Sequence, residues 1–184
     1  MNFPYLNYLE LLQPNPHLTI RGRTVALKDC PALPKAAQES GIPIIVGGGG
    51  PKRTPNLAAR FANEFNLPFS SPRDFELQAN RVRQACEFIS RDPDSMVFSV
   101  AQVLCIGTTE KELERRSAKI GRDLPELREN GVAGTLDEAR ERIRSFQQFG
   151  VSRMYFQVLD EDDLDHVSLL SELVDEFNEV EENA

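Results

Sequence analysis

The stretch VGGGGPKRT, residues 46–54, combines the residue types that bind phosphate. Glycines have no Cβ atom, so the backbone N–H groups of the run can approach an anion closely and converge on one oxygen. Two cations, Lys52 and Arg53, follow at the same place. Thr54 then opens a predicted helix, whose first-turn N–H groups and dipole favour negative charge. The candidate phosphate ligands are Gly47, Gly48, Gly49, Gly50, Lys52, Arg53 and Thr54.

The spacing of this stretch matches neither of the two common phosphate fingerprints. There is no G-x-x-x-x-G-K-[ST], and although Gly47 and Gly49 give G-x-G, Lys52 stands at the third glycine position. Glycine clusters also occur in turns that bind nothing. A phosphate cradle and a plain strand-to-helix turn therefore both stay open, and the polar residues after the glycines favour the cradle.

Other residue types give weaker signals. Glu64 and Asn66 lie in the next predicted strand and could face a pocket, although solvent-facing positions and helix ends are commoner places for such residues. No serine has a histidine nearby that could act as its base, so a nucleophilic triad has no support and the catalytic residues stay unknown.

Neither the histidines nor the cysteines suggest a metal site. We interpret His17 and His166 as surface residues, the latter on a solvated helix face among acids. The three cysteines are far apart and form no Cys-x-x-Cys pair, which argues against both a zinc site and a disulfide framework. We expect no bound metal.

The elements that must position these residues alternate along the chain. The segment IPIIVGG, 42–48, is apolar on successive residues and predicts a strand buried on both faces. Capping signals at Ser71, Thr109 and Thr135 predict the starts of three helices. The other expected elements are a helix at Tyr5–Leu12, a β-hairpin in 17–27, a helix at 54–62, strands in 64–69, 96–107 and 151–158, and a final amphipathic helix.

This order of strands and helices predicts parallel strands joined by right-handed crossovers. Two architectures fit it, an open doubly wound sheet or a piece of a (β/α)8 barrel. In both, ligands gather at the carboxyl ends of the strands, where the glycines lie.

Composition limits the classes of function. The chain has 184 residues, of which 40% are hydrophobic, and this suits one globular domain. The N-terminus has no apolar signal core and no stretch is long enough to span a membrane, so we expect a cytoplasmic protein without a membrane partner. The net charge of −8 comes from residues 160–184, which carry eleven acids and no Lys or Arg. This acidity argues against nucleic acid as a partner.

Two long segments resemble a known family. IPIIVGGGGPKRTPNLAARFANEFN, starting at Ile42, and GVAGTLDEARERIRSFQQFGVSRMYF, starting at Gly131, are similar to the C-terminal half of the luciferase-like monooxygenase superfamily. The likeness is greatest to the branch that uses the deazaflavin coenzyme F-420. HLTIRGRTVALKDCPALPKAAQ resembles the hairpin and connection before that half, so the resemblance covers about Leu9 to Leu159.

The resemblance implies the fold and the reaction. It implies the C-terminal half of a (β/α)8 TIM barrel, with about four parallel strands and flanking helices after an N-terminal hairpin. It also implies hydride transfer with F-420 or FMN, whose phosphate the glycine-rich segment would hold, while Asn66 would lie near the cofactor or a small-molecule substrate. The expected organisation is 1–41 as helix, hairpin and connection, 42–175 as the half-barrel, and 176–184 as an acidic tail.

The chain is shorter than a complete barrel, which takes roughly 250 residues. The resemblance places the catalytic residues of the family in the other half. We therefore expect a truncated or split member that needs a second copy, as a homodimer, or a partner chain to supply the missing half. The alternative is a non-catalytic half-barrel that binds or interacts through the retained phosphate loop.

Overall fold

A computed structural model describes residues 17–21, 26–31, 33–38 and 41–182. The chain divides into two compact units, Met1–Ile44 and Ile45–Ala184. The helix expected at Tyr5–Leu12 lies outside the described residues. In the first unit, β1 (Leu18–Arg21) pairs antiparallel with β2 (Ala26–Cys30), as the hairpin prediction requires.

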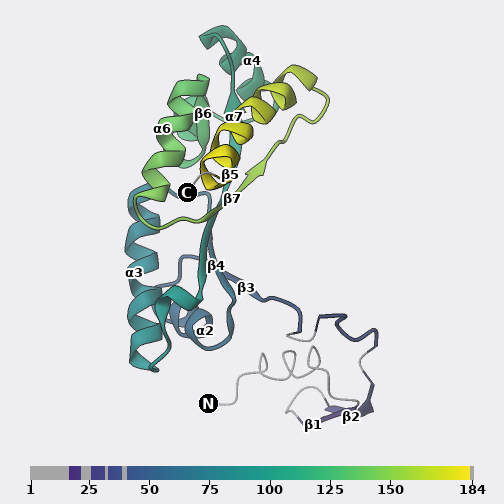
Figure 1. The fold of residues 1–184 in the computed structure, drawn as a ribbon. Coiled ribbons are helices and arrows are strands. Elements are labelled where there is room, and N and C mark those ends of the chain that lie inside the picture. The colour runs from purple at the N-terminus through teal and green to yellow at the C-terminus, as the bar shows by residue number, and fades with distance from the viewer. Residues whose placement is uncertain (1–16, 22–25, 32, 39–40, 183–184) are drawn as a thin grey trace. The chain divides into compact units, whose positions relative to one another are not determined.

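The second unit is built on parallel strands (Figure 1). Strand β3 (Ile45–Gly47) pairs with β4 (Glu64–Pro68), β4 pairs with β5 (Val97–Ile106), and β5 pairs with β7 (Arg153–Gln157). Strands β4 and β7 lie on opposite edges of β5, so these four strands follow one another across the sheet in the order of the sequence. This order has no reversal, unlike the order of an open doubly wound sheet, so it decides between the two expected architectures in favour of part of a barrel.

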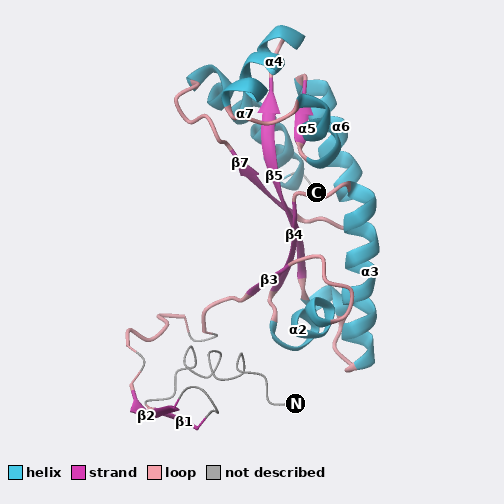
Figure 2. Ribbon diagram, turned by 180° about the vertical axis from the view of Figure 1, so that it is seen from behind, coloured by secondary structure: helices cyan, strands magenta, loops and turns pink. Residues whose placement is uncertain are grey.

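A short strand, β6 (Val132–Gly134), pairs with the last three residues of β5 and was not predicted. Its three residues are too few to show a periodic pattern. The helices connect and flank the strands, as Figure 2 shows. They are α2 (Arg53–Phe61), α3 (Pro72–Phe88), the 3₁₀ turn η1 (Pro93–Ser95), α4 (Glu110–Lys119), α5 (Leu124–Asn130), α6 (Leu136–Gln147) and α7 (Leu164–Glu182).

Two of the predicted capping signals form as expected. The Ser71 hydroxyl accepts a hydrogen bond from the amide of Asp74 at the start of α3. Thr135 and Glu138 make a complete reciprocal capping box at α6. At α4 only half of the box forms, because the Glu112 carboxylate binds the amide and hydroxyl of Thr108 instead of the amide of Thr109.

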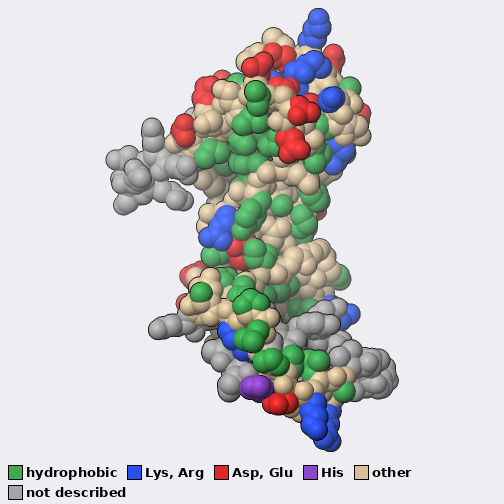
Figure 3. Space-filling view, turned by 90° about the vertical axis from the view of Figure 1, so that its right-hand side faces the viewer, with side chains coloured by type: hydrophobic (Ala, Val, Ile, Leu, Met, Phe, Trp, Pro, Cys, Tyr) green, Lys and Arg blue, Asp and Glu red, His purple; other side chains and the backbone are tan. Residues whose placement is uncertain are grey.

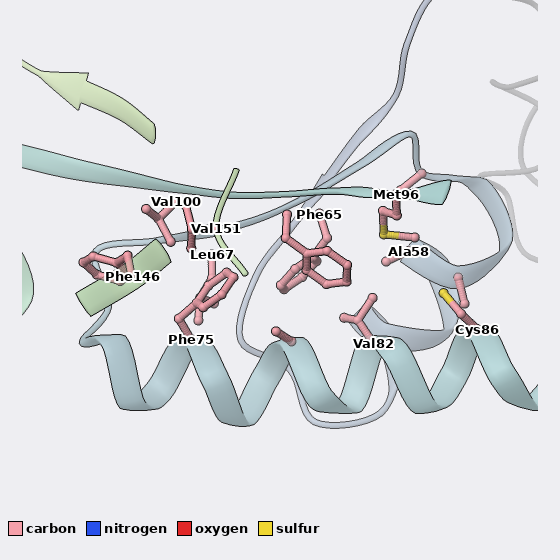
Figure 4. Close-up of a cluster of buried hydrophobic side chains, with 14 residues drawn as sticks. Ala58, Phe65, Leu67, Phe75, Val82, Cys86, Met96, Val100, Phe146 and Val151 are labelled. Atoms are coloured by element: carbon pink, nitrogen blue, oxygen red, sulfur yellow. The ribbon is translucent and has the colours of Figure 1, made fainter. Parts of the chain in front are cut away.

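The main core lies between the sheet and the helices on one of its faces (Figure 4). Phe75 and Phe146, from α3 and α6, meet edge to face at 6.3 Å between ring centroids. Strand residues alternate, so Phe65 and Leu67 of β4 enter this core while Glu64 and Asn66 face the other side of the sheet. At the carboxyl end of β5 both faces are covered, since Val103 and Cys105 pack against α4 and α5.

The prediction that the strand in IPIIVGG is buried on both faces is wrong. Ile45 of β3 is 52% exposed, and only its neighbour Val46 packs against the core. The reason is that Val46 faces the main core, to which α2 and α3 contribute, whereas Ile45 lies on the opposite face of the sheet. Figure 3 views the unit from the side opposite α3 and α6, where hydrophobic side chains are exposed among charged ones.

Candidate functional site

The glycine-rich segment continues the edge of the sheet before it turns into α2. Gly47 lies opposite Asn66 in the parallel ladder, and the amide of Gly48 donates to the Asn66 carbonyl at 3.2 Å. Gly48 has φ +123°, a conformation that side-chain-bearing residues rarely adopt. The loop therefore starts beside Asn66, and the structure brings together two of the predicted site elements.

A residue that the sequence did not single out fixes the loop. Gln78 of α3 is 2% exposed, and its Nε2 donates to the carbonyls of Gly48 at 3.3 Å and Gly50 at 2.9 Å. A buried amide that holds two carbonyls on one side restricts the rotation of the intervening peptides. Its position inside a regular helix gave no signal in the sequence.

The loop also leaves donors free. Within the described chain, the amides of Gly49 and Gly50 have no hydrogen-bond partner, and α2 begins after Lys52 without a side-chain cap. A Cβ added to Gly50 would lie 3.0 Å from the Thr54 Oγ1 atom, so the hydroxyl sits directly against the loop. The donor set of free amides, a hydroxyl and the exposed Lys52 and Arg53 fits a phosphate. The binding roles of these residues stay predictions.

A polar cluster lies on the face of the sheet opposite the main core. Glu64 is 4% exposed, and its Oε1 accepts hydrogen bonds from Ser99 Oγ at 2.6 Å and from Tyr155 Oη at 2.9 Å. Its Oε2 pairs with Nη1 of Arg153. Asn66 joins the cluster because its Nδ2 donates to Ser99 Oγ at 2.9 Å.

The pairing register of three neighbouring strands brings the residues of this cluster together. Asn66, Ser99 and Arg153 stand side by side across β4, β5 and β7, so their side chains emerge at one level. The phenol of Tyr155 and the carboxylate of Glu64 raise the pKa of Arg153. The sequence indicated that Glu64 and Asn66 could face a pocket, but Ser99, Arg153 and Tyr155 were missed because nothing local marks them.

A second polar network closes the carboxyl end of β5. Arg116 of α4 donates to the Ile106 carbonyl at 2.7 Å and forms a bidentate pair with Asp163. His166 accepts a hydrogen bond at Nε2 from the Ile106 amide at 3.1 Å. Placing His166 on a solvated helix face is therefore wrong, because it is 3% exposed. Burial is the main cause that lowers the pKa of His166, and the charge of Arg116 lowers it further.

Metal-binding clusters and membrane-spanning helices are absent from residues 17–21, 26–31, 33–38 and 41–182. No group of three or more His, Cys, Asp or Glu side chains there could hold a metal ion. No helix in the same residues is long and apolar enough to cross a membrane.

Comparison with known proteins identifies the family. The family model described as luciferase-like monooxygenase matches residues 5–166. The chain belongs to this family. No curated protein sequence matches it.

Solved structures of luciferase-like enzymes share the fold at low sequence identity. An F420-dependent secondary alcohol dehydrogenase in complex with an F420-acetone adduct aligns over 90% of this chain with a TM-score of 0.71 and 14% identity. A coenzyme F420-dependent tetrahydromethanopterin reductase from Methanopyrus kandleri aligns over 89% with a TM-score of 0.70 and 16% identity. A riboflavin lyase solved with modified FMN and riboflavin aligns over 89% with a TM-score of 0.65 and 13% identity.

The matched region is only part of each of these proteins. This chain covers 57% of the alcohol dehydrogenase, 58% of the reductase and 48% of the riboflavin lyase. The predicted fold class is confirmed, since the parallel sheet and its flanking helices match about half of a luciferase-like TIM barrel.

Proposed function

We propose that this chain forms the cofactor-phosphate half of a flavin- or deazaflavin-dependent oxidoreductase that transfers hydride to or from a small molecule. The observation that carries the proposal is the glycine loop of a luciferase-like half-barrel, with two unpartnered amides beside Thr54 at the carboxyl end of β3. F-420 and FMN, the candidate cofactors, each carry a phosphate that these groups could hold. They would bind and orient that phosphate, while the ring supplies the redox chemistry.

The location of Asn66 supports the same proposal. Its carbonyl anchors Gly48, while its side chain belongs to the polar cluster on the opposite face from the core. One residue thus links the loop to the surface that would face the inside of a barrel. A ligand whose phosphate lay on the loop would extend its remaining atoms toward this surface.

We further propose that a second copy or a partner chain supplies the other strands. In the described sheet, β3 pairs only with β4 and β7 pairs only with β5, so each presents an unpaired edge. Unpaired edges and exposed apolar residues such as Ile45 favour association with another chain. Sedimentation analysis of the purified chain, alone and at increasing concentration, distinguishes self-association from a monomer that needs a different partner.

The experiment for cofactor binding compares FMN, F-420 and riboflavin. Riboflavin has the ring of FMN but no phosphate, so we expect FMN to bind at least tenfold more tightly, as followed by the polarisation of flavin fluorescence. The variant Thr54→Val should narrow that difference, because it removes a donor from the loop. Equal affinities for FMN and riboflavin would reject the phosphate assignment, and no binding of FMN or F-420 would reject the proposal.

A hydride-transfer assay then separates enzyme from binding module. Reduction or oxidation of the bound cofactor in the presence of substrate is the expected outcome for the assembled barrel. Tight phosphate-dependent binding without any turnover, even after the other half is supplied, would favour the non-catalytic half-barrel.

A further inference from the structure

We propose that Arg153, held by the buried carboxylate of Glu64, binds the carboxylate of an organic acid on the face of the sheet opposite the main core, where the ring of Tyr155 would contact the body of that acid. This site deepens the proposed function, on which it rests, because it names the class of substrate that the barrel would take. It is formed by the cluster of Glu64, Ser99, Asn66, Arg153 and Tyr155.

The Glu64 carboxylate holds its neighbours and is not itself available to a ligand. It is 4% exposed, and its two oxygens already accept from Ser99, Tyr155 and Arg153. A carboxylate with three donors around it has little remaining capacity to accept another hydrogen bond. Glu64 therefore acts as a positioning residue.

Arg153 presents the rest of its guanidinium to the open side. Its side chain is 52% exposed, and Nη1 alone contacts Glu64. An arginine has five N–H donors in a rigid fork that matches a carboxylate in geometry. Its Nε and Nη2 edge can receive a second carboxylate without breaking the pair with Glu64.

The charge of Glu64 does not prevent an anion from binding at this edge. A carboxylate bound at the Nε and Nη2 edge would lie closer to the guanidinium than to Glu64, which contacts Nη1, so the attraction would exceed the repulsion. The buried charge also fixes the arginine before a ligand arrives, which lowers the entropy lost on binding.

The surroundings favour an acid with an apolar body over a bare inorganic anion. Tyr155 is 39% exposed and stands two residues after Arg153, on the same face of β7. Ala101, opposite Tyr155 in the ladder, and Val97 are also partly exposed on that face. An aromatic ring beside a carboxylate-binding arginine suits a planar acid such as benzoate.

The test is a titration of the full chain with benzoate and with benzamide, which has the same shape without the charge. We expect benzoate to shift the ¹H–¹⁵N signals of Arg153 and Tyr155 and to bind at least tenfold more tightly than benzamide. Arg153→Gln should weaken benzoate binding at least tenfold. The matched control Arg128→Gln removes an arginine of similar exposure that pairs with Glu110 on the helices, and it should leave benzoate affinity unchanged.

Several results would overturn the proposal. They are the absence of benzoate binding, equal affinity for benzamide, or unchanged affinity in Arg153→Gln. If Arg153→Gln does not fold, Arg153→Lys keeps the charge and loses the fork, and it should still weaken benzoate binding by threefold or more. Inorganic phosphate is titrated separately and should shift Gly49 and Gly50, so failure of the phosphate loop and failure of this site give different signals.

Discussion

Asp163 binds the guanidinium of Arg116 through both carboxylate oxygens, at 3.0 Å to Nε and 3.2 Å to Nη2. The side chains of Arg116 and Asp163 are 3% and 7% exposed, and the Arg116 guanidinium holds the pKa of Asp163 well below its usual range. Because Arg116 also binds the Ile106 carbonyl, this pair ties the start of α7 to the end of β5 through α4.

The first prediction concerns this pair. Asp163→Asn should lower the free energy of unfolding by about 3 kcal/mol, because it leaves the buried Arg116 with only the more distant carboxylate of Glu112, at 3.9 Å. Urea denaturation measures the change. Glu110→Gln breaks the exposed pair with Arg128 and should cost less than about 1 kcal/mol. Equal losses in the two variants would contradict the assignment of Asp163 as a structural anchor.

The second prediction is a pH dependence set by His166. Its pKa is lowered in the folded state, so between that pKa and the unfolded value of about 6.5 the unfolded chain binds more protons. The free energy of unfolding should therefore fall as the pH decreases through 6.5 toward the pKa of His166 in the folded state. Above pH 6.5 the contribution of His166 to stability should be fully present. Thermal unfolding from pH 8 to pH 5 measures it. His166→Gln should flatten the profile.

The third prediction separates backbone strain from ligand binding at glycine. Gly48 and Gly121 both have positive φ, of +123° and +69°. Alanine at either position should reduce stability by about 1 kcal/mol. Only Gly48→Ala should also weaken the binding of FMN, since the added Cβ would lie inside the loop, 3.6 Å from Thr54 Oγ1. Fluorescence titration of the two variants decides whether the phosphate lies at Gly48.

The fourth prediction concerns Gln78. Gln78→Ala removes the donor that holds the carbonyls of Gly48 and Gly50 and should cost about 1–2 kcal/mol of stability. The amide of Gly48 should then exchange faster with deuterium than in the unaltered chain. Asn80→Ala changes an exposed residue two positions further along α3 and is the control. Unchanged exchange at Gly48 in Gln78→Ala would show that the loop does not depend on this side chain.

Helix starts were predictable because each depends on a few adjacent residues. Ser71 with Asp74, and Thr135 with Glu138, satisfy amides within one turn of their own helices. At Thr109 the same signal was only half right, since the neighbouring Thr108 competed for the Glu112 carboxylate. The capping pattern alone does not indicate which of two adjacent threonines the carboxylate will bind.

The burial of strands was less predictable. Apolar residues on successive positions indicated that the strand at Ile45 is buried on both faces, yet its exposure depends on how many layers cover the sheet. His166 shows the converse, because it lies in an acidic segment but its buried ring accepts a hydrogen bond from the Ile106 amide. Both outcomes are set by neighbours that are distant in the sequence.

The sequence by itself determined the glycine loop between a strand and α2, and with it the candidate phosphate ligands from Gly47 to Thr54. The tertiary structure alone decided that Gln78 fixes this loop and that Glu64 meets Arg153, which is 89 residues away. The physical reason is range: glycine conformations and helix starts follow from adjacent residues. A contact between Glu64 and Arg153 instead requires three strands to pair in one register.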